Sequence, residues 1–206
     1  MTEVDSPARV DGRTARAERT RAAIVEAHLG LIVEGDLRPT GEKIAARAGT
    51  SLRALWTNFK DMEALFAASG ERLFQQLAAE HRPIDSALPL PRRVEEFCDQ
   101  RARMLEILAP AARAARLREP FSAQLRENKT KMIASVRAEI ELLFARELEL
   151  DPIEREQLLQ ALSVASTWAS WSMLRDELAL PIAEARAVMS RTVTALLLAA
   201  IAGGLR

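Results

Sequence analysis

The chain has 206 residues, which is enough for one or two domains with a sizeable core. Apolar residues make up 49% and aromatic residues only 4%, so alanine and leucine carry the core, as is typical of helical proteins. The 29 basic and 29 acidic residues cancel, which argues against a globally basic nucleic-acid coat but leaves local patches possible. One cysteine, Cys98, excludes an internal disulfide framework, and the polar start MTEVDSPARV favours a cytoplasmic protein.

The spacing of apolar residues predicts helices along almost the whole chain. Residues 1–12 are polar and are expected to form a disordered arm. Helices are predicted over 14–33, 41–48, 51–59 and 61–82, and the proline-rich segment 83–91 after them is the best domain boundary. Further helices are predicted over 91–108, 111–118, 121–148, 152–178 and 182–202, with prolines at or near their starts. The expected fold is therefore all-α, with about nine helices.

The stretch KIAARAGTSLRALWTNF, residues 43–59, joins two short helices through a glycine turn. At 100° per residue, one side of the second helix is apolar and carries Leu52, Leu55 and Phe59. The opposite side carries Arg53, Thr57 and Lys60. Gly49 supplies the left-handed backbone that the turn needs, and Thr40 and Ser51 or Thr50 cap the two helices. This is the helix-turn-helix arrangement, whose second helix enters a DNA major groove.

Residues 21–68 resemble the DNA-binding domain of TetR-type bacterial transcriptional regulators. The resemblance covers about a quarter of the chain and depends on fixed spacing across four helices. Its matching residues are Ile24, Ala27, Gly35, Thr40, Ile44, Ala45, Gly49, Ser51, Leu55, Phe59, Glu63 and Leu65. Two positions depart from the pattern of the family. Trp56 stands where the family commonly has tyrosine, and Met62 stands where it often has a lysine that contacts phosphate.

The resemblance implies a homodimer that binds a palindromic double-stranded DNA operator, usually represses, and is released by a small-molecule effector. It implies a DNA-binding domain at residues 13–60 and a ligand-binding and dimerisation domain at residues 61–206. The last two predicted helices would form the dimer contact, although small apolar residues there also suit the core of a monomer. Residues 9–60 hold ten Lys or Arg against six Asp or Glu, which is a modest local surplus of positive charge.

The candidate DNA contacts follow from the polar outer side of the motif. Arg53 is the first choice for base readout, because a guanidinium can bond bidentately to guanine, with Thr57 and Asn58 as second choices. Phosphate contacts are expected from Thr40, Trp56 and Lys60, with Lys43 and Arg13 or Arg16 in support. Ser51, the cap of the second helix, completes the set. For each of these residues the alternative is a solvated surface side chain.

A second group of residues is the candidate effector site. Trp168, Trp171 and Arg175 share one side of a predicted helix, and seven residues of earlier helices are expected to face them: Phe97, Arg101, Met104, Leu105, Phe121, Leu125 and Met132. Aromatic, thioether and a few polar groups suit a largely apolar ligand with a polar or anionic end. Ordinary core packing is the alternative for any one of them.

The sequence argues against an enzyme and leaves one other class of protein open. An enzyme is not expected, because the chain lacks the nucleophile-elbow, phosphate-loop, dinucleotide and HExxH motifs. With one cysteine and two histidines, a structural metal site is not expected either, nor is a cofactor. The remaining alternative is a helical protein-interaction module that has lost specific DNA binding.

Overall fold

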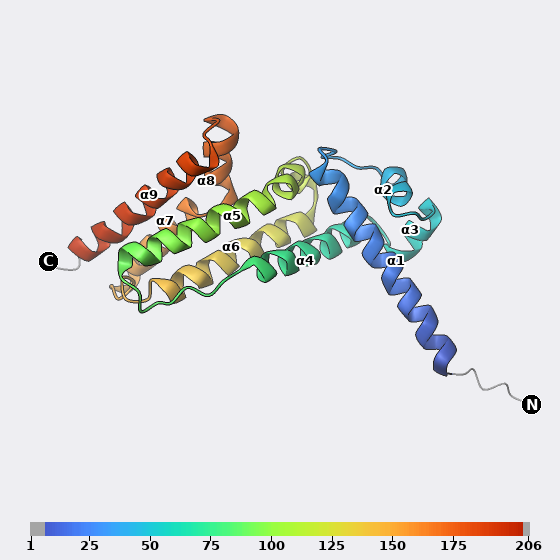
Figure 1. The fold of residues 1–206 in the computed structure, drawn as a ribbon, viewed down its shortest axis with the longest axis horizontal. Helices are drawn as coiled ribbons and strands as arrows, with labels where there is room; N and C mark the ends of the chain where they lie inside the picture. Colours follow the sequence, from blue (N-terminus) through green and yellow to red (C-terminus); the bar gives the residue numbers. More distant parts are fainter. Residues whose placement is uncertain (1–6, 204–206) are drawn as a thin grey trace, which may run out of the picture. The chain divides into compact units, whose positions relative to one another are not determined.

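The computed structural model describes the backbone of residues 7–203 and side chains from residue 14 onward. All regular elements in this range are helical, which confirms the all-α expectation. The nine α-helices are α1 (Pro7–Val33), α2 (Gly41–Arg47), α3 (Leu52–Asn58), α4 (Met62–Glu80), α5 (Leu90–Arg116), α6 (Ala123–Leu143), α7 (Pro152–Ala165), α8 (Trp168–Ser172) and α9 (Ile182–Gly203) (Figure 1). A 3-10 turn at Glu119–Phe121 and a π-helix at Met173–Glu177 complete the set.

The chain divides into two compact units. The first contains residues 1–75 and 110–126, and the second contains residues 76–109 and 127–206. Three helices, α4, α5 and α6, contribute residues to both units, so the division does not follow a single linker. The proline-rich segment that was expected to separate domains lies inside the second unit.

The core of the first unit joins the first three helices and the start of α4. Its buried residues are Ile24, Val25, Ala27, Ile44, Ala45, Leu55, Phe59 and Leu65. Alanine at two of these places lets the helices approach closely, and the two short helices α2 and α3 both contact α1. Burial of this apolar surface holds helices that are too short to be stable alone.

The core of the second unit lies between α5, α6, α7, α8 and α9. Phe97 of α5 meets Phe144 edge to face, with ring centroids 5.5 Å apart. Leu159 and Leu162 of α7 and Val193 and Leu197 of α9 are fully buried in the same cluster. Helices α5 and α6 lie side by side in Figure 1, in agreement with the hydrogen bond of 2.8 Å between Gln100 Nε2 and Glu139 Oε1.

Several helices differ in their bounds from those that the sequence predicts. Helix α5 continues through Pro110 to Arg116, although a new helix was expected after this proline. A proline inside a helix removes one backbone hydrogen bond, and here the buried Ala109 and Ala114 on either side keep the helix packed. The expected helix 152–178 is instead α7, α8 and a π-helix in succession. Helix α6 ends at Leu143 rather than near residue 148, and an ion-paired segment follows it.

The N-terminal arm is described only in part. Helix α1 begins at Pro7, seven residues before the expected start at Thr14, so residues 7–12 are helical. Residues 1–6 of the expected arm lie outside the described residues.

Candidate functional site

The turn before α3 is built by two residues whose conformations match the sequence pattern. Gly49 has φ +64°, in the left-handed region that L-residues rarely adopt. Ser51 then caps α3, because its hydroxyl accepts a hydrogen bond of 3.1 Å from Ala54 N. Thr40 caps α2 in the same way through Lys43 N, at 3.4 Å. The caps fix where both helices begin and which side of α3 turns outward.

Helix α3 has a buried side and an exposed side. Leu55 and Phe59 are 0% and 1% exposed. Arg53, Thr57 and Lys60 are exposed, and the Lys60 side chain, just beyond the helix, is 82% exposed. An α-helix with its side chains is about 10–12 Å in diameter, which fits the major groove of B-DNA, about 12 Å wide. The exposed side therefore presents one guanidinium, one hydroxyl and one ammonium group.

Some of the predicted DNA contacts are already engaged within the protein. Asn58 is half-buried and its amide donates to Ala54 O at 2.8 Å, so it is less available to a base than Arg53. The Thr57 hydroxyl donates to Arg53 O at 2.8 Å and keeps an oxygen that can accept. Lys43 Nζ forms an ion pair of 2.7 Å with Asp36, and this hydrogen bond holds the pKa of the Asp36 carboxyl below its usual range. Lys43 would have to exchange this partner to reach a phosphate.

Trp56 lies directly over the first residue of α2. A methyl group added at Gly41 would come within 2.8 Å of Cζ2 of the indole, too close for an unshifted side chain. Trp56 is nevertheless 39% exposed, so one part of the ring packs on α2 while the rest faces solvent. The indole thus occupies the space that a side chain at position 41 would need.

Arg21 of α1 is a functional candidate that the sequence analysis missed. Its guanidinium stacks 4.0 Å from the centroid of Phe59, and Nη1 donates to Asn58 O at 2.6 Å. These contacts fix the C-terminal end of α3 to α1. A cation three residues before a buried isoleucine gives no sequence signal for such a contact. Arg16 is exposed on the same helix, whereas the side chain of Arg13 lies outside the described residues.

The predicted effector residues fall into two sets. Phe97, Leu105 and Trp171 are buried in the core of the second unit, with Trp168 packed against it and Arg101 only 3% exposed. Arg175, Met104 and Met132 are half-buried in that unit. Phe121 and Leu125 belong to the first unit, where Phe121 is 90% exposed and Leu125 is half-buried. The structure therefore does not bring Phe121 into the buried cluster.

The polar groups of this cluster have different partners. Glu106 Oε1 accepts from Trp171 Nε1 at 2.8 Å and from Arg175 Nε at 2.9 Å. Arg175 Nη1 also donates to Leu180 O at 2.5 Å, so this guanidinium is bonded on two sides. Arg101 Nη2 donates to Ser166 O at 3.0 Å, and its buried Nε has no partner. The two arginines that the sequence placed together are thus in unlike environments.

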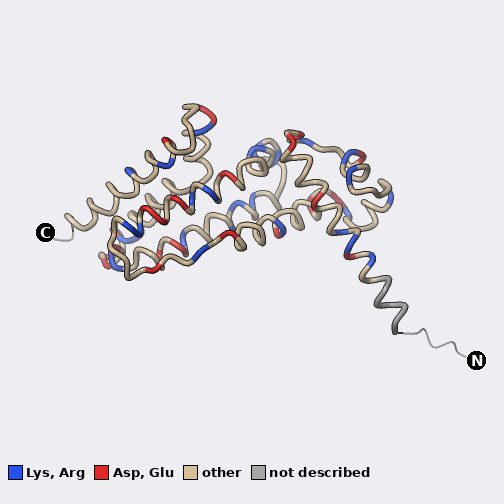
Figure 2. The backbone as a smooth tube through the Cα atoms, in the orientation of Figure 1, with Lys and Arg blue, Asp and Glu red and all other residues tan. Residues whose placement is uncertain are grey.

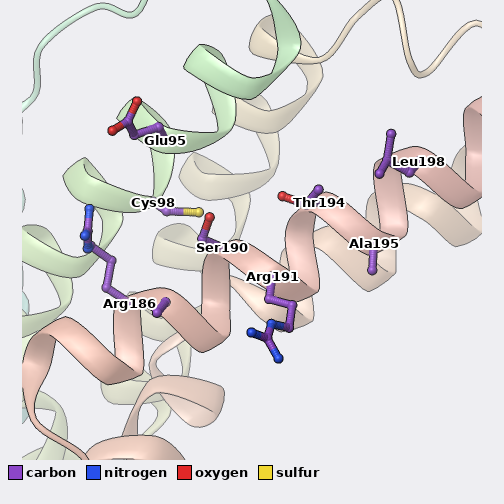
Figure 3. Close-up of a pocket in the computed structure, with 9 residues that line it drawn as sticks. Glu95, Cys98, Arg186, Ser190, Arg191, Thr194, Ala195 and Leu198 are labelled. Atoms are coloured by element: carbon purple, nitrogen blue, oxygen red, sulfur yellow. The ribbon is translucent and has the colours of Figure 1, made fainter.

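A hollow of about 610 Å³ lies elsewhere in the second unit, between α5 and α9 (Figure 3). Its walls include Glu95, Cys98, Arg186, Ser190 and Leu198. Burial raises the pKa of the Cys98 thiol to about 12, so the group is a thiol at neutral pH and a poor redox sensor. No motif in the sequence predicts this hollow. The small residues along that side of α9 were its only signal.

Helix α9 is also the one described helix that is long and apolar enough to cross a membrane. Its mean hydropathy is 1.4 over 18 residues, of which 22% are buried. Figure 2 shows few charged residues along it. Among the residues with described side chains, no cluster of three or more His, Cys, Asp or Glu could hold a metal ion.

Comparison with known proteins yields one structural likeness. No family model matches the sequence, and no curated protein matches it. The fold is similar to the crystal structure of a transcriptional regulator from Rhodococcus sp. Rha1, with a TM-score of 0.65 and 18% sequence identity. The likeness covers 89% of this chain and 96% of the other. At this level of identity the comparison establishes a shared fold.

Proposed function

We propose that this chain is a DNA-binding transcriptional regulator of the TetR type, in which residues 13–60 bind DNA and residues 61–206 bind a ligand and dimerise. The observation that carries the proposal is the division of α3 into a buried side, with Leu55 and Phe59, and an exposed side, with Arg53 and Thr57. The shared fold with a protein described as a transcriptional regulator supports it. Such a regulator acts in the cytoplasm, where the operator is.

In this proposal α3 is the recognition helix. Arg53 reads guanine through a bidentate hydrogen bond, and Thr57 offers a hydroxyl oxygen to a neighbouring base. Lys60 and Trp56 contact the phosphate backbone. Lys60 does so by its exposed ammonium group, which lies 3.9 Å from an Asp61 carboxylate oxygen, and Trp56 by its indole N–H. Supporting DNA contacts come from residues whose polar groups already form hydrogen bonds within the protein: Thr40, Lys43, Ser51 and Asn58.

The proposed regulator is a homodimer that joins through its last two helices. Val188 and Leu198 of α9 are 42% and 53% exposed, whereas Ala185, Met189, Val193 and Leu197 of the same helix are buried. Leu178 and Val164, at 58% and 64%, add to the apolar surface of the same unit. Covering this surface with a second copy would remove it from water and would pair two recognition helices for a palindromic operator.

The function we propose includes repression and release by a small, largely apolar molecule. Release requires that the effector bind more tightly to the state whose recognition helices do not fit the operator. The aromatic and aliphatic cluster around Trp171 in the second unit supports an apolar effector.

Selection of random DNA duplexes by the purified full chain, followed by sequencing, tests the DNA-binding part. A regulator should enrich a palindrome of about 10 to 20 base pairs. Enrichment of no sequence would contradict the proposal and would favour the alternative, a helical protein-interaction module.

Two single variants then separate base readout from phosphate contact. Arg53→Ala should lose the preference for the selected palindrome, by about 1–3 kcal/mol at the guanine position, because its bidentate contact is gone. Lys60→Ala should weaken binding to all duplexes alike and reduce the slope of affinity against salt by about one. Arg38→Ala is a matched control, since Arg38 is exposed and outside the proposed contacts. If both test variants bind like the wild type, the assigned roles are wrong.

A further inference from the structure

Arg101 is a buried charge with too few partners. Its side chain is 3% exposed, and the one hydrogen bond that it makes runs from Nη2 to the backbone oxygen of Ser166, at 3.0 Å. Nε is buried and bonds to nothing. A guanidinium offers five N–H donors, and a buried donor that stays unpaired costs free energy. This position therefore has a hydrogen-bonding capacity that the protein itself does not use.

Among the described residues, no carboxylate forms an ion pair with Arg101. The acid that acts on it electrostatically, Glu139, is held by Gln100 Nε2 at 2.8 Å and by His81 Nε2 at 3.4 Å. Burial lowers the pKa of Arg101, and Glu139 offsets this only in part. A lone buried cation is stable only if something else compensates it.

The surroundings of Arg101 are otherwise apolar. Phe97 and Leu105, one helical turn on either side along α5, are 0% and 1% exposed. Leu162 and Trp171 belong to the same buried cluster. Ser166 is fully buried, but its hydroxyl is committed to Leu162 O at 2.7 Å. A molecule that reached Arg101 would meet one cation inside a hydrocarbon and aromatic environment.

The backbone that faces Arg101 is irregular. Ser166 lies between the end of α7 at Ala165 and the start of α8 at Trp168, and α8 passes directly into the π-helix at Met173–Glu177. Ala179, just beyond, has φ +51°, which is unusual for a residue with a side chain. π-Helices and strained backbone concentrate at functional sites and ligand-binding positions. Entry of a ligand beside Ser166 would therefore disturb little regular structure.

We infer that Arg101 binds the carboxylate of an otherwise apolar small molecule, which is the effector of the regulator. The inference rests on the proposed function and narrows its effector to a chemical class. It also distinguishes the two arginines of the predicted site, because Arg175 already bonds to Glu106 and Leu180 while Arg101 is free to accept an anion. One buried cation matches a singly charged carboxylate. A doubly charged phosphate would leave one negative charge uncompensated, and Glu139, which acts electrostatically on Arg101, would repel it.

The first test needs no ligand. Arg101→Met keeps the length of the side chain and removes the uncompensated charge, so in the absence of ligand its melting temperature should equal or exceed that of the wild type by up to a few degrees. Arg93→Met, which breaks a fully paired arginine on the same helix, is the matched control and should melt well below the wild type. A fall of more than about 5 °C for Arg101→Met would show that the guanidinium is structural and would overturn the inference.

The second test uses matched probes. The straight-chain acids from hexanoate to dodecanoate, together with 2-naphthoate, are each compared with the corresponding neutral amide by thermal unfolding. At least one acid should raise the melting temperature of the wild type by about 5 °C at 100 times its Kd, and its amide should do much less. In Arg101→Met the difference between acid and amide should disappear. No preference for any acid in the wild type, or a preference that persists in Arg101→Met, would overturn the inference.

The DNA selection with the wild-type chain keeps the two proposals separate. If it enriches no palindrome but the acids stabilise the protein through Arg101, the regulator is refuted and the carboxylate site stands. If a palindrome is enriched and no acid binds, the regulator stands and the carboxylate site is refuted.

Discussion

Arg93 and Arg101 lie two helical turns apart on α5, and both are 3% exposed. Arg93 has a full set of partners, because it bonds to both Glu147 oxygens at 2.6 and 2.8 Å, to Leu143 O at 2.8 Å and to Leu88 O at 3.0 Å. Arg101 has one carbonyl and an unpaired Nε. Equal burial therefore does not mean an equal role: the first arginine ties α5 to the segment after α6, and the second is available to a ligand.

The largest expected effect comes from the paired arginine. Arg93→Met should lower the free energy of unfolding by about 3–5 kcal/mol, because Glu147, 8% exposed, loses its cation while it stays buried. Urea denaturation measures the loss. The double variant Arg93→Met/Glu147→Leu should recover most of it, since both charges are then absent. A loss below about 1 kcal/mol for the single variant would remove the distinction between the two arginines.

The second effect is a pH dependence of the same pair. The Arg93 guanidinium lowers the pKa of the Glu147 carboxyl. A carboxyl whose folded pKa is lowered stabilises the fold above its unfolded pKa of about 4.3, and this contribution is lost as the pH falls through the folded pKa. The difference in unfolding free energy between the wild type and Glu147→Gln should therefore shrink as the pH falls from 6 to 3. A difference that stays constant would mean that the ion pair contributes nothing.

A smaller effect is expected at Glu106, which bonds to Trp171 and Arg175 in a half-exposed position. Glu106→Gln keeps an acceptor for one partner but removes the charge opposite Arg175, and should cost about 1 kcal/mol. Chemical denaturation followed by tryptophan fluorescence measures both the stability and the environment of Trp171. A cost as large as that of Arg93→Met would mean that partial exposure does not weaken such a contact.

The smallest effect is expected next to Arg93 itself. Arg92 pairs with Glu95 at 2.6 Å and with Glu96 at 3.5 Å, and its side chain is 59% exposed. Exposed ion pairs contribute little, so Arg92→Ala should shift the melting temperature by less than about 1 °C. A larger shift in melting temperature would show that the contribution of Arg92 depends on its proximity to the Arg93–Glu147 pair rather than on its own burial.

The sequence was most informative where local rules decide the structure. Gly49 has the predicted left-handed backbone, Thr40 and Ser51 have the predicted caps, and Leu55 and Phe59 are buried as their spacing indicated. Each of these depends on residues within one or two helical turns. Turn and cap chemistry of this kind is visible in a single sequence.

The features that the sequence missed depend on distant residues. Pro110 was expected to end a helix, but buried alanines on either side keep α5 continuous. The break after Ala165 contains no proline or glycine, and its Ser166 and Thr167 also occur in the middle of helices, so the sequence did not mark it. The sequence does not distinguish Arg101 from Arg175. The difference between them is a tertiary contact, because Arg175 bonds to the carboxylate of Glu106 on α5 and Arg101 does not. The DNA and effector assignments remain predictions.

The contact between Trp56 and Gly41 has a consequence for how this sequence can change over time. Because the indole fills the space above position 41, the two residues are not independent. A smaller residue at 56 removes the nearer of the two side chains that a Cβ at 41 would meet, and Leu52 Cδ1, at 3.1 Å, is then the neighbour that must shift. Alanine or serine at 41 should therefore be less harmful after Trp56 has been replaced than while tryptophan is present. Substitutions at these two positions should therefore show epistasis, and the path that replaces Trp56 first is the one open to natural variation.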